Sequence, residues 1–298
     1  WSYYDPADAL AGVDRCAGGA PFSAQFSHYV RRATESNSLD RIGVTFTKTR
    51  YVQYTDETFT TRVAAPSWEG ILGPTLRAAV GDTLVIVARN ALGFNVSVHA
   101  HGVQYTKGNE GAPYNDGTAG AQKDDDAIPP GGVHTYVYCV PESAGPGPAD
   151  GSSVVWLYHD HVHEVNGTNS GLIGSMIITA AESARADATP SDVDHEFVLL
   201  FAAFDENVAS LASVNVARRL PQFAGNSANL SASARSRLTY QLRNYNHRFA
   251  SSMQKWSING HMQCTLPGLA WEAGARVRLH LLAMGDEELH TPTLAGHT

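Results

Sequence analysis

Short apolar runs separated by glycine and proline are the feature that most constrains the fold of this chain. The clearest runs cover residues 83–88, 134–140, 154–158 and 172–178. Short runs with frequent turn signals, and little apolar repetition at the helical period, are typical of antiparallel β-sandwiches. We therefore predict an all-β chain in which residues 83–88 form a buried strand. Residues 50–59 alternate aromatic or β-branched with polar side chains, which predicts a further strand.

An internal repeat divides the chain into two units. Pro74 and Gly81 recur as Pro267 and Gly274, so both positions are offset by 193 residues. The first unit continues for 105 residues after its proline, whereas 31 residues follow Pro267. The second unit is therefore expected to lack its last strands, which leaves an open sheet edge and an uncovered face.

The repeat and the composition together predict the domain organisation. A chain of 298 residues is long enough for two domains. We predict these domains at residues 1–182 and 193–298, with the small, polar stretch 180–191 as their linker. Residues 211–237 are rich in Ser, Ala and Asn, and are expected to form a surface loop or a short helix. We expect the whole chain to be part of a longer polypeptide.

Charge and hydropathy exclude some classes of partner. The net charge of −8 argues against binding a nucleic-acid backbone. No run of 18 apolar residues is present, so the sequence predicts no membrane-spanning helix. The chain begins at Trp1 without a signal-peptide pattern, which indicates a mature or trimmed product.

The cysteines and glycosylation sequons bear on the compartment. Cys16, Cys139 and Cys264 are an odd number, so at least one stays unpaired, and there is no C-x-x-C motif. These cysteines leave the compartment open, and Cys139 is expected to be a buried thiol on a strand. N-x-S/T sequons suit a secreted protein, and they begin at Asn95, Asn166 and Asn229.

Two His-X-His pairs are the clearest candidate site. His99 and His101 form the first pair, and His159 and His161 form the second. Because side chains two residues apart lie on one face of a strand, each pair presents two imidazoles together, about 6.6 Å apart at the Cα atoms. Imidazole suits Zn, Cu, Fe and Ni, and the zinc-protease motif H-E-x-x-H is absent. The pattern favours copper bound between β-domains, with histidines that hold no metal as the alternative.

Several motifs in collinear order resemble the ceruloplasmin- and hephaestin-type multicopper oxidase family. They include YVQYTDETF at 51–59, GILGP at 70–74, HAHGVQY at 99–105, YHDH at 158–161, GLIG at 171–174, SING at 257–260 and LPGL at 266–269. The resemblance covers most of residues 43–298. It implies the first domain and the front of the second domain of a six-domain ferroxidase, and hence two cupredoxin-like Greek-key β-sandwiches, the second incomplete.

The resemblance also implies roles for the histidines. His99 matches a ligand of the type 2 copper, while His101, His159 and His161 match ligands of the type 3 pair. The other half of this trinuclear cluster is expected from C-terminal cupredoxin domains, in the same polypeptide or another subunit. His290 matches a type 1 copper ligand of the second domain. The implied reaction oxidises a substrate such as Fe(II) by single electrons and reduces dioxygen to water.

Further residues match sites of the same family. Asp116 resembles a carboxylate that relays protons to dioxygen, although it also suits a turn before Gly117. A calcium site is implied by the Lys107 carbonyl and by Gln122, Asp125 and Asp126, although charge runs are usually solvated turns. The alternative function is a non-catalytic extracellular scaffold like the A domains of coagulation factors. In either case the resemblance implies a secreted or cell-surface protein.

Overall fold

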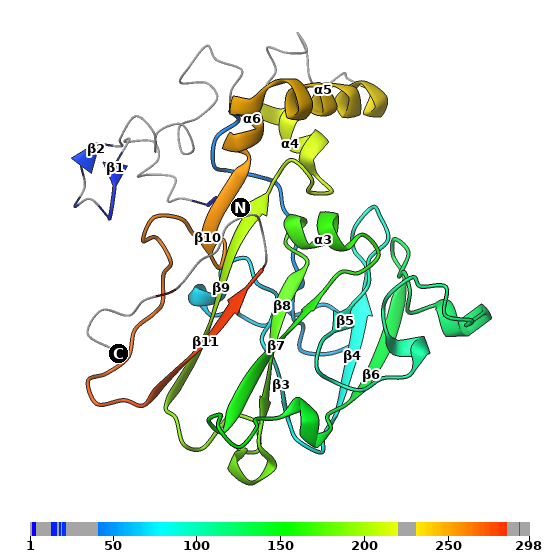
Figure 1. Cartoon of the computed structure of the whole chain (residues 1–298). Helices are drawn as coiled ribbons and strands as arrows, with labels where there is room; N and C mark the ends of the chain where they lie inside the picture. The colour runs from blue at the N-terminus through cyan, green and yellow to red at the C-terminus, as the bar shows by residue number, and fades with distance from the viewer. Residues whose placement is uncertain are drawn as a thin grey trace.

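The described part of the chain is built mainly of strands (Figure 1). The computed structural model describes residues 2–3, 13–16, 18, 20–21, 41–219, 231–284 and 292. The strands are β1 (Val13–Asp14), β2 (Ala20–Pro21), β3 (Leu76–Ala79), β4 (Thr83–Arg89), β5 (His99–Ala100), β6 (Val133–Cys139), β7 (Ser153–His159), β8 (Ile173–Thr179), β9 (His195–Asp205), β10 (Gln254–Ile258) and β11 (Val277–Ala283). The α-helices are α3 (Glu164–Ser170), α4 (Ala212–Arg219), α5 (Ala232–Tyr245) and α6 (His247–Ser252). Short 3-10 turns are η2 (Ser67–Glu69), η3 (Lys107–Asn109), η4 (Gly120–Lys123), η5 (Glu142–Ala144) and η6 (Ala181–Ser183). The all-β prediction is confirmed.

Strand β8 is the centre of the first unit. It lies in a four-stranded sheet of order β3-β8-β7-β5, and every one of its residues is buried. Ile173 and Ile177 pack into one hydrophobic core, while Met176 and Ile178 pack into another. Because successive side chains point to opposite faces, a strand covered on both sides reads as a continuous apolar run.

Strand β4 is only partly covered. It pairs antiparallel with β6 along its whole length, in a two-stranded sheet that packs over the core of Tyr136, Tyr138 and Met176. Its residues are nevertheless exposed or half-buried, and Val85 is 55% exposed. The prediction of a strand here is therefore confirmed, but the prediction that this strand is buried was wrong. The reason is that β4 has no described partner along its second edge.

Strand β9 opens the second unit, as the sequence predicts. It is the central strand of the sheet β10-β9-β11, antiparallel to β10 and parallel to β11. Val198, Leu200 and Phe204 share a core with Ile173 and Ile177 of β8, so the two units pack on each other. Leu281 of β11 is 46% exposed.

One local prediction is wrong. Residues 50–59 are not a strand, because they find no sheet partner beyond an isolated bridge between Tyr54 and Arg62. The predicted linker contains η6 and a bridge between Ala184 and Pro190, so it is ordered. Within 211–237 the structure has the short helix α4, in which Val216 is fully buried. The domain boundaries at 182 and 193 stay a prediction.

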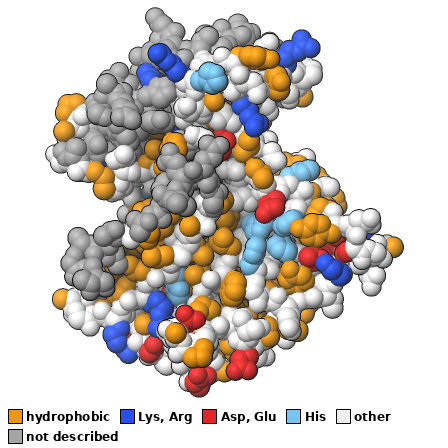
Figure 2. Space-filling model, in the orientation of Figure 1, with side chains coloured by type: hydrophobic (Ala, Val, Ile, Leu, Met, Phe, Trp, Pro, Cys, Tyr) orange, Lys and Arg blue, Asp and Glu red, His pale blue; other side chains and the backbone are white. Residues whose placement is uncertain are grey.

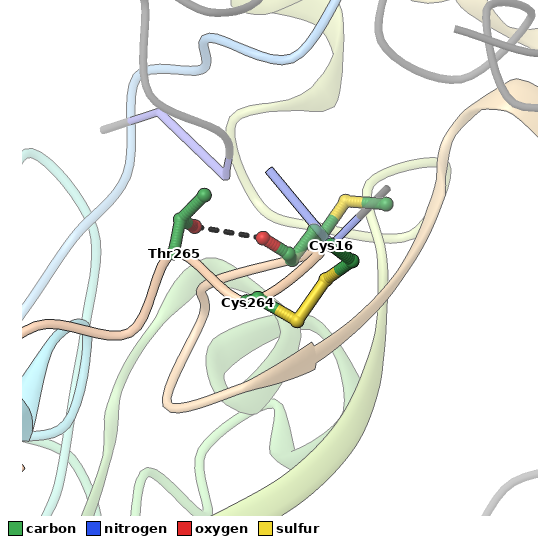
Figure 3. Close-up of a disulfide and its surroundings, with 4 residues drawn as sticks. Cys16, Cys264 and Thr265 are labelled. Atoms are coloured by element: carbon green, nitrogen blue, oxygen red, sulfur yellow. Dashed lines mark hydrogen bonds between the residues drawn. A yellow bond between two sulfur atoms is a disulfide. The ribbon is translucent and has the colours of Figure 1, made fainter. Parts of the chain in front are cut away.

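A disulfide connects the beginning of the chain to the second unit. Cys16 and Cys264 are joined across 248 residues of sequence, with Cα atoms 5.7 Å apart (Figure 3). The neighbouring Thr265 donates a hydrogen bond to the Met262 carbonyl at 2.7 Å. Cys139 is free and exposed, so the prediction of a buried thiol was wrong. Its strand β6 alternates between buried and exposed positions, and Cys139 lies on the exposed face.

None of the helices in the described ranges is long and apolar enough to cross a bilayer.

Candidate metal centre

Two neighbouring strands bring the four histidines together. Strands β5 and β7 pair antiparallel, with His99 directly opposite His159. The next residues keep this register, since the His101 amide donates to the Leu157 carbonyl at 2.9 Å and the His161 amide donates to Ser97 Oγ at 3.0 Å. Both members of each pair therefore lie on one face of the sheet, as their spacing predicts.

The four imidazole rings form one cluster. The ring centroids of His99 and His161 are 4.8 Å apart, and those of His99 and His159 are 5.6 Å apart. The Nε2 atoms of His101 and His159 are 2.9 Å apart. Ligand nitrogens of His99, His101 and His159 lie within 4.8 Å of one another. Figure 2 shows histidine side chains gathered at the surface on the side where β5 and β7 lie in Figure 1.

Backbone carbonyls determine which ring nitrogen carries the proton in two of the histidines. His99 Nδ1 is 2.6 Å from the Glu110 carbonyl, and His159 Nδ1 is 2.9 Å from the Asp160 carbonyl. A carbonyl only accepts, so both Nδ1 atoms carry the proton and both Nε2 atoms have an unprotonated lone pair. In His159 this lone pair accepts a hydrogen bond from His101 Nε2 at 2.9 Å. This arrangement fixes the tautomer and the orientation of a metal-binding imidazole.

The cluster is partly shielded from water. Burial lowers the pKa values of the His99, His101 and His159 imidazoles below their usual range, and neighbouring imidazoles lower them further. These rings are therefore neutral at pH 7. Metal ions bind the neutral form of imidazole, so the chemistry of the donor set fits copper.

Asp160 and Ser97 are positioning residues that sequence reasoning missed. The Asp160 side chain is buried and accepts from the backbone amide of Ser97 at 2.9 Å and from that of His163 at 3.4 Å. It thereby ties the start of the first His-X-His strand to the loop that follows the second. Burial raises the pKa of this carboxyl group. The acid between His159 and His161 is the sequence signal that could have revealed it.

Gly111 allows a second loop to reach the cluster. Its φ is +70°, and a Cβ atom there would lie 2.3 Å from the Val98 carbonyl oxygen. The Gly111 amide donates to Asp125 Oδ2 at 2.9 Å. The neighbouring Glu110 carbonyl is the group that accepts from His99. Asp125 thus supports the orientation of His99 through the loop backbone, a link that the sequence does not reveal.

The acidic loop holds Asp116 as a carboxylate. Hydrogen bonds from the Thr118 hydroxyl and amide, together with Lys123 at 3.6 Å, hold the pKa of Asp116 at about 2. Its Oδ2 atom is buried without a hydrogen-bond partner. The Lys123 ammonium also donates to the Tyr114 carbonyl, and the Tyr114 hydroxyl is 3.3 Å from His161 Nε2. Asp116 is therefore connected to the cluster through Tyr114.

The residues expected to bind calcium lie on the same loop system. Asp125 and Asp126 are buried, and each leaves its Oδ1 atom without a partner. Burial raises the pKa of Asp125, and Lys123 donates to Asp126 Oδ2 at 2.9 Å. Gly108, next to Lys107, lies close to Gln122, since a Cβ atom on Gly108 would be 3.7 Å from the Gln122 carbonyl oxygen.

The second-domain copper ligand is not placed. His290 lies outside the described residues. His163 is exposed at the start of α3.

The family model described as multicopper oxidase matches residues 49–183. Human hephaestin is 37% identical over 86% of this chain and 21% of its own length. Mouse ferroxidase HEPHL1 is 36% identical over 87% of this chain and 21% of its own length. Human coagulation factor VIII is 35% identical over 94% of this chain and 11% of its own length. The chain spans about a fifth of the length of the first two relatives, and less of the third.

Proposed function

Because residues 49–183 belong to the multicopper oxidase family, we propose that this chain supplies half of a copper cluster that reduces dioxygen to water. The observation that carries the proposal is the group of four imidazoles on the paired strands β5 and β7. Their open face requires complementary ligands from C-terminal cupredoxin domains, in the same polypeptide or another subunit. Residues 1–298 alone are expected to bind copper weakly and to consume no dioxygen.

Within this proposal the histidines divide between the metal positions. His99 binds the type 2 copper, and His101, His159 and His161 bind the type 3 pair. Bound copper would supply one-electron chemistry between the reducing substrate and dioxygen. The protein contributes Nε2 lone pairs at His99 and His159, whose Nδ1 atoms are held by carbonyls. His290 is assigned to a type 1 copper of the second domain.

Asp116 is proposed to move protons. Its carboxylate is ionised at neutral pH, because Thr118 and Lys123 stabilise the charge. The buried Oδ2 atom has no partner, so it is the atom that can accept a hydrogen bond from a water molecule and orient that water for proton transfer. In the full-length oxidase, Asp116→Asn should lower dioxygen consumption at unchanged copper content. Asp124→Asn, two positions from Asp126 and exposed, is the matched control and should leave both unchanged.

The reducing substrate is proposed to be ferrous iron, which makes the whole protein a ferroxidase. This choice rests on the similarity to a protein named ferroxidase HEPHL1. The setting is proposed to be extracellular or cell-surface. The Cys16–Cys264 disulfide supports it, because disulfides persist in oxidising compartments. Asn95 and Asn166 are both exposed, as glycosylation acceptors need to be.

The copper proposal is tested by the metal content of the full-length protein. Elemental analysis should find copper, with the blue absorbance of a thiolate-bound ion. His159→Ala should remove copper from the cluster, whereas His163→Ala, a matched exposed histidine, should retain it. Circular dichroism confirms that both variants fold. A copper-free full-length protein, or full occupancy in the His159 variant, contradicts the proposal.

The second candidate function is a non-catalytic scaffold. It is favoured by the similarity to coagulation factor VIII, which extends over 94% of this chain. The retention of all four clustered histidines argues for the oxidase. A scaffold predicts a full-length protein without redox-active copper and without dioxygen consumption.

We also propose that the acidic loop binds calcium through the Lys107 carbonyl, Gln122, Asp125 and Asp126. Calcium prefers several oxygen ligands, and the two orphaned Oδ1 atoms fit that need. Calorimetry on residues 1–298 should detect calcium binding that Asp125→Asn abolishes and Asp124→Asn preserves. Equal binding by both variants would place the ion elsewhere.

A further inference from the structure

The stretch 207–271 is 65 residues long and contains no aspartate or glutamate. The whole chain has 29 acidic residues in 298, so an average stretch of this length would contain about six. The same stretch carries six arginines and one lysine, in a chain whose net charge is −8. A surface that only faces water usually mixes both signs of charge. Positive charge is therefore concentrated in one segment of an acidic protein, which favours a negatively charged partner.

The helices α4, α5 and α6 place this charge on one part of the molecule. Helix α5 packs on α4 and leads directly into α6. The three helices carry the exposed arginines Arg218, Arg237, Arg243 and Arg248, which we call the arginine surface. Figure 2 shows Lys and Arg side chains over the region where α5 and α6 lie in Figure 1, while most of the visible Asp and Glu side chains lie over the first unit.

On α5 two arginines flank an exposed tyrosine. Arg237, Tyr240 and Arg243 are spaced three residues apart, so each arginine is a neighbour of the tyrosine on the helix surface. Tyr240 is 60% exposed and Tyr245 is 76% exposed, with ring centroids 6.4 Å apart. In the part of the chain that the structure describes, neither Arg237 nor Arg243 forms an ion pair. Both guanidinium groups can therefore meet an anion beside an aromatic ring.

The apolar side of α5 is covered by the protein itself. Leu242 is buried, and Leu238 packs against the same core, which also contains Val216 of α4 and Phe249 of α6. An amphipathic helix binds a bilayer by burying its apolar side in the lipid. Because that side of α5 packs inward, only its polar and aromatic side can meet a partner.

The use of arginine narrows the class of partner further. Arginine presents a planar fork of donors that binds two oxygens of one anionic group, whereas lysine acts as a point charge. Within the described part of 207–271, every exposed side chain with a fixed positive charge is arginine, since Lys255 is buried. Sulfate groups offer such oxygens and stay ionised at any physiological pH. The net charge of −8 argues against a nucleic-acid backbone.

We propose that the arginine surface binds a sulfated polysaccharide. The guanidinium groups bind sulfate oxygens, and Tyr240 packs against the apolar face of a sugar ring between two such contacts. The helix rises by about 9 Å from Arg237 to Arg243, so one linear polymer can contact both side chains. This partner rests on the extracellular setting proposed above, where sulfated polysaccharides are found.

Titration calorimetry of heparin, a sulfated polysaccharide, into residues 1–298 tests the proposal. Binding should weaken as the salt concentration rises, because contacts with a polyanion release counterions. Arg237→Gln combined with Arg243→Gln should weaken binding about tenfold and make it less dependent on salt. The matched control combines Arg62→Gln with Arg89→Gln, two exposed arginines of the first unit, and should change binding by less than about twofold. Circular dichroism checks that both double variants fold.

Two further probes separate the classes of partner. Polyglutamate offers carboxylates on a peptide, and vesicles that contain phosphatidylserine offer a negatively charged lipid surface. Both should bind more weakly than heparin at equal concentrations of charge, because neither presents sugar rings to Tyr240. Tyr240→Ala should remove most of this preference for heparin.

Four results would overturn the proposal. Two of them are an absence of heparin binding by the unaltered chain and equal heparin affinity of the two double variants. Binding of polyglutamate at least as tight as that of heparin would assign the surface to an acidic protein segment, and the same result with the vesicles would assign it to lipid. The measurements need neither copper nor secretion, so any of these results would leave the oxidase proposal and the extracellular setting standing.

Discussion

Glu196 is the clearest place to test how the two units are held together. Its side chain on β9 is 4% exposed and accepts hydrogen bonds from Arg77 of β3 at 2.6 Å, Ser153 of β7 at 2.7 Å and His280 of β11 at 2.8 Å. Burial alone raises the pKa of Glu196, but the donors outweigh it and lower the pKa to about 2 from 4.5. A carboxylate removed from this site leaves buried donors unpaired.

The lowered pKa of Glu196 gives the size of its contribution to the free energy of unfolding and the direction in which that contribution changes with pH. A folded-state pKa 2.5 units below the unfolded value corresponds to about 3 kcal/mol of stability. Because the pKa is lowered in the folded state, this stability is complete above pH 4.5 and is lost as the pH falls towards 2. Linkage predicts that about 2 kcal/mol is gone by pH 3. Glu196→Gln should therefore cost about 3 kcal/mol at pH 7 and about 1 kcal/mol at pH 3.

Urea unfolding of both proteins between pH 7 and pH 3 measures this difference, and subtraction cancels the titration of shared groups that do not contact residue 196. The matched control is Glu272→Gln. Glu272 contacts His195 at 3.2 Å on the same sheet but is 84% exposed, so its loss should have little effect at any pH. The reasoning is refuted if the loss of unfolding free energy caused by Glu196→Gln does not change with pH. It is also refuted if this loss is no larger than the loss caused by Glu272→Gln.

Three further predictions follow from local geometry. Gly102→Ala should lower stability by about 1–3 kcal/mol, because φ is +78° and the new Cβ would lie 2.3 Å from the Trp156 ring; an unchanged melting temperature contradicts this. Reduction of the Cys16–Cys264 disulfide should cost about 2–5 kcal/mol, since it closes a long loop; equal urea midpoints with and without reductant would oppose it. Cys139 is exposed, so a thiol reagent should modify one cysteine per chain without denaturant; no modification of the native chain would show that the thiol is covered.

The local pattern of the sequence was enough to predict the histidine faces and the central strands. The His-X-His spacing places both imidazoles of a pair on one side, because side chains alternate along a strand. The run at 172–178 predicts a strand, and β8 covers residues 173–179. Both conclusions depend only on the order of side chains within one strand, and consecutive residues of the sequence give that order.

Pairing between distant segments decided the rest. Residues 50–59 carry a strand pattern but find no partner, and β4 is partly exposed because its second edge has no described neighbour. Cys139 lies on the exposed face of β6, because side chains alternate along this strand. Only the tertiary structure shows which face of β6 packs against the core.

The metal centre shows the same division between sequence and tertiary structure. The sequence showed the candidate ligands and acids, but not how they are arranged in space. These residues are the four histidines, Asp116 and the acidic run. The register that sets His99 opposite His159, and the carbonyls that orient their Nε2 atoms, came only from the fold. The sequence shows which side chains each strand carries. Contacts between strands depend on the strand register and on which loops lie beside the strands, and both are set by packing of the whole core.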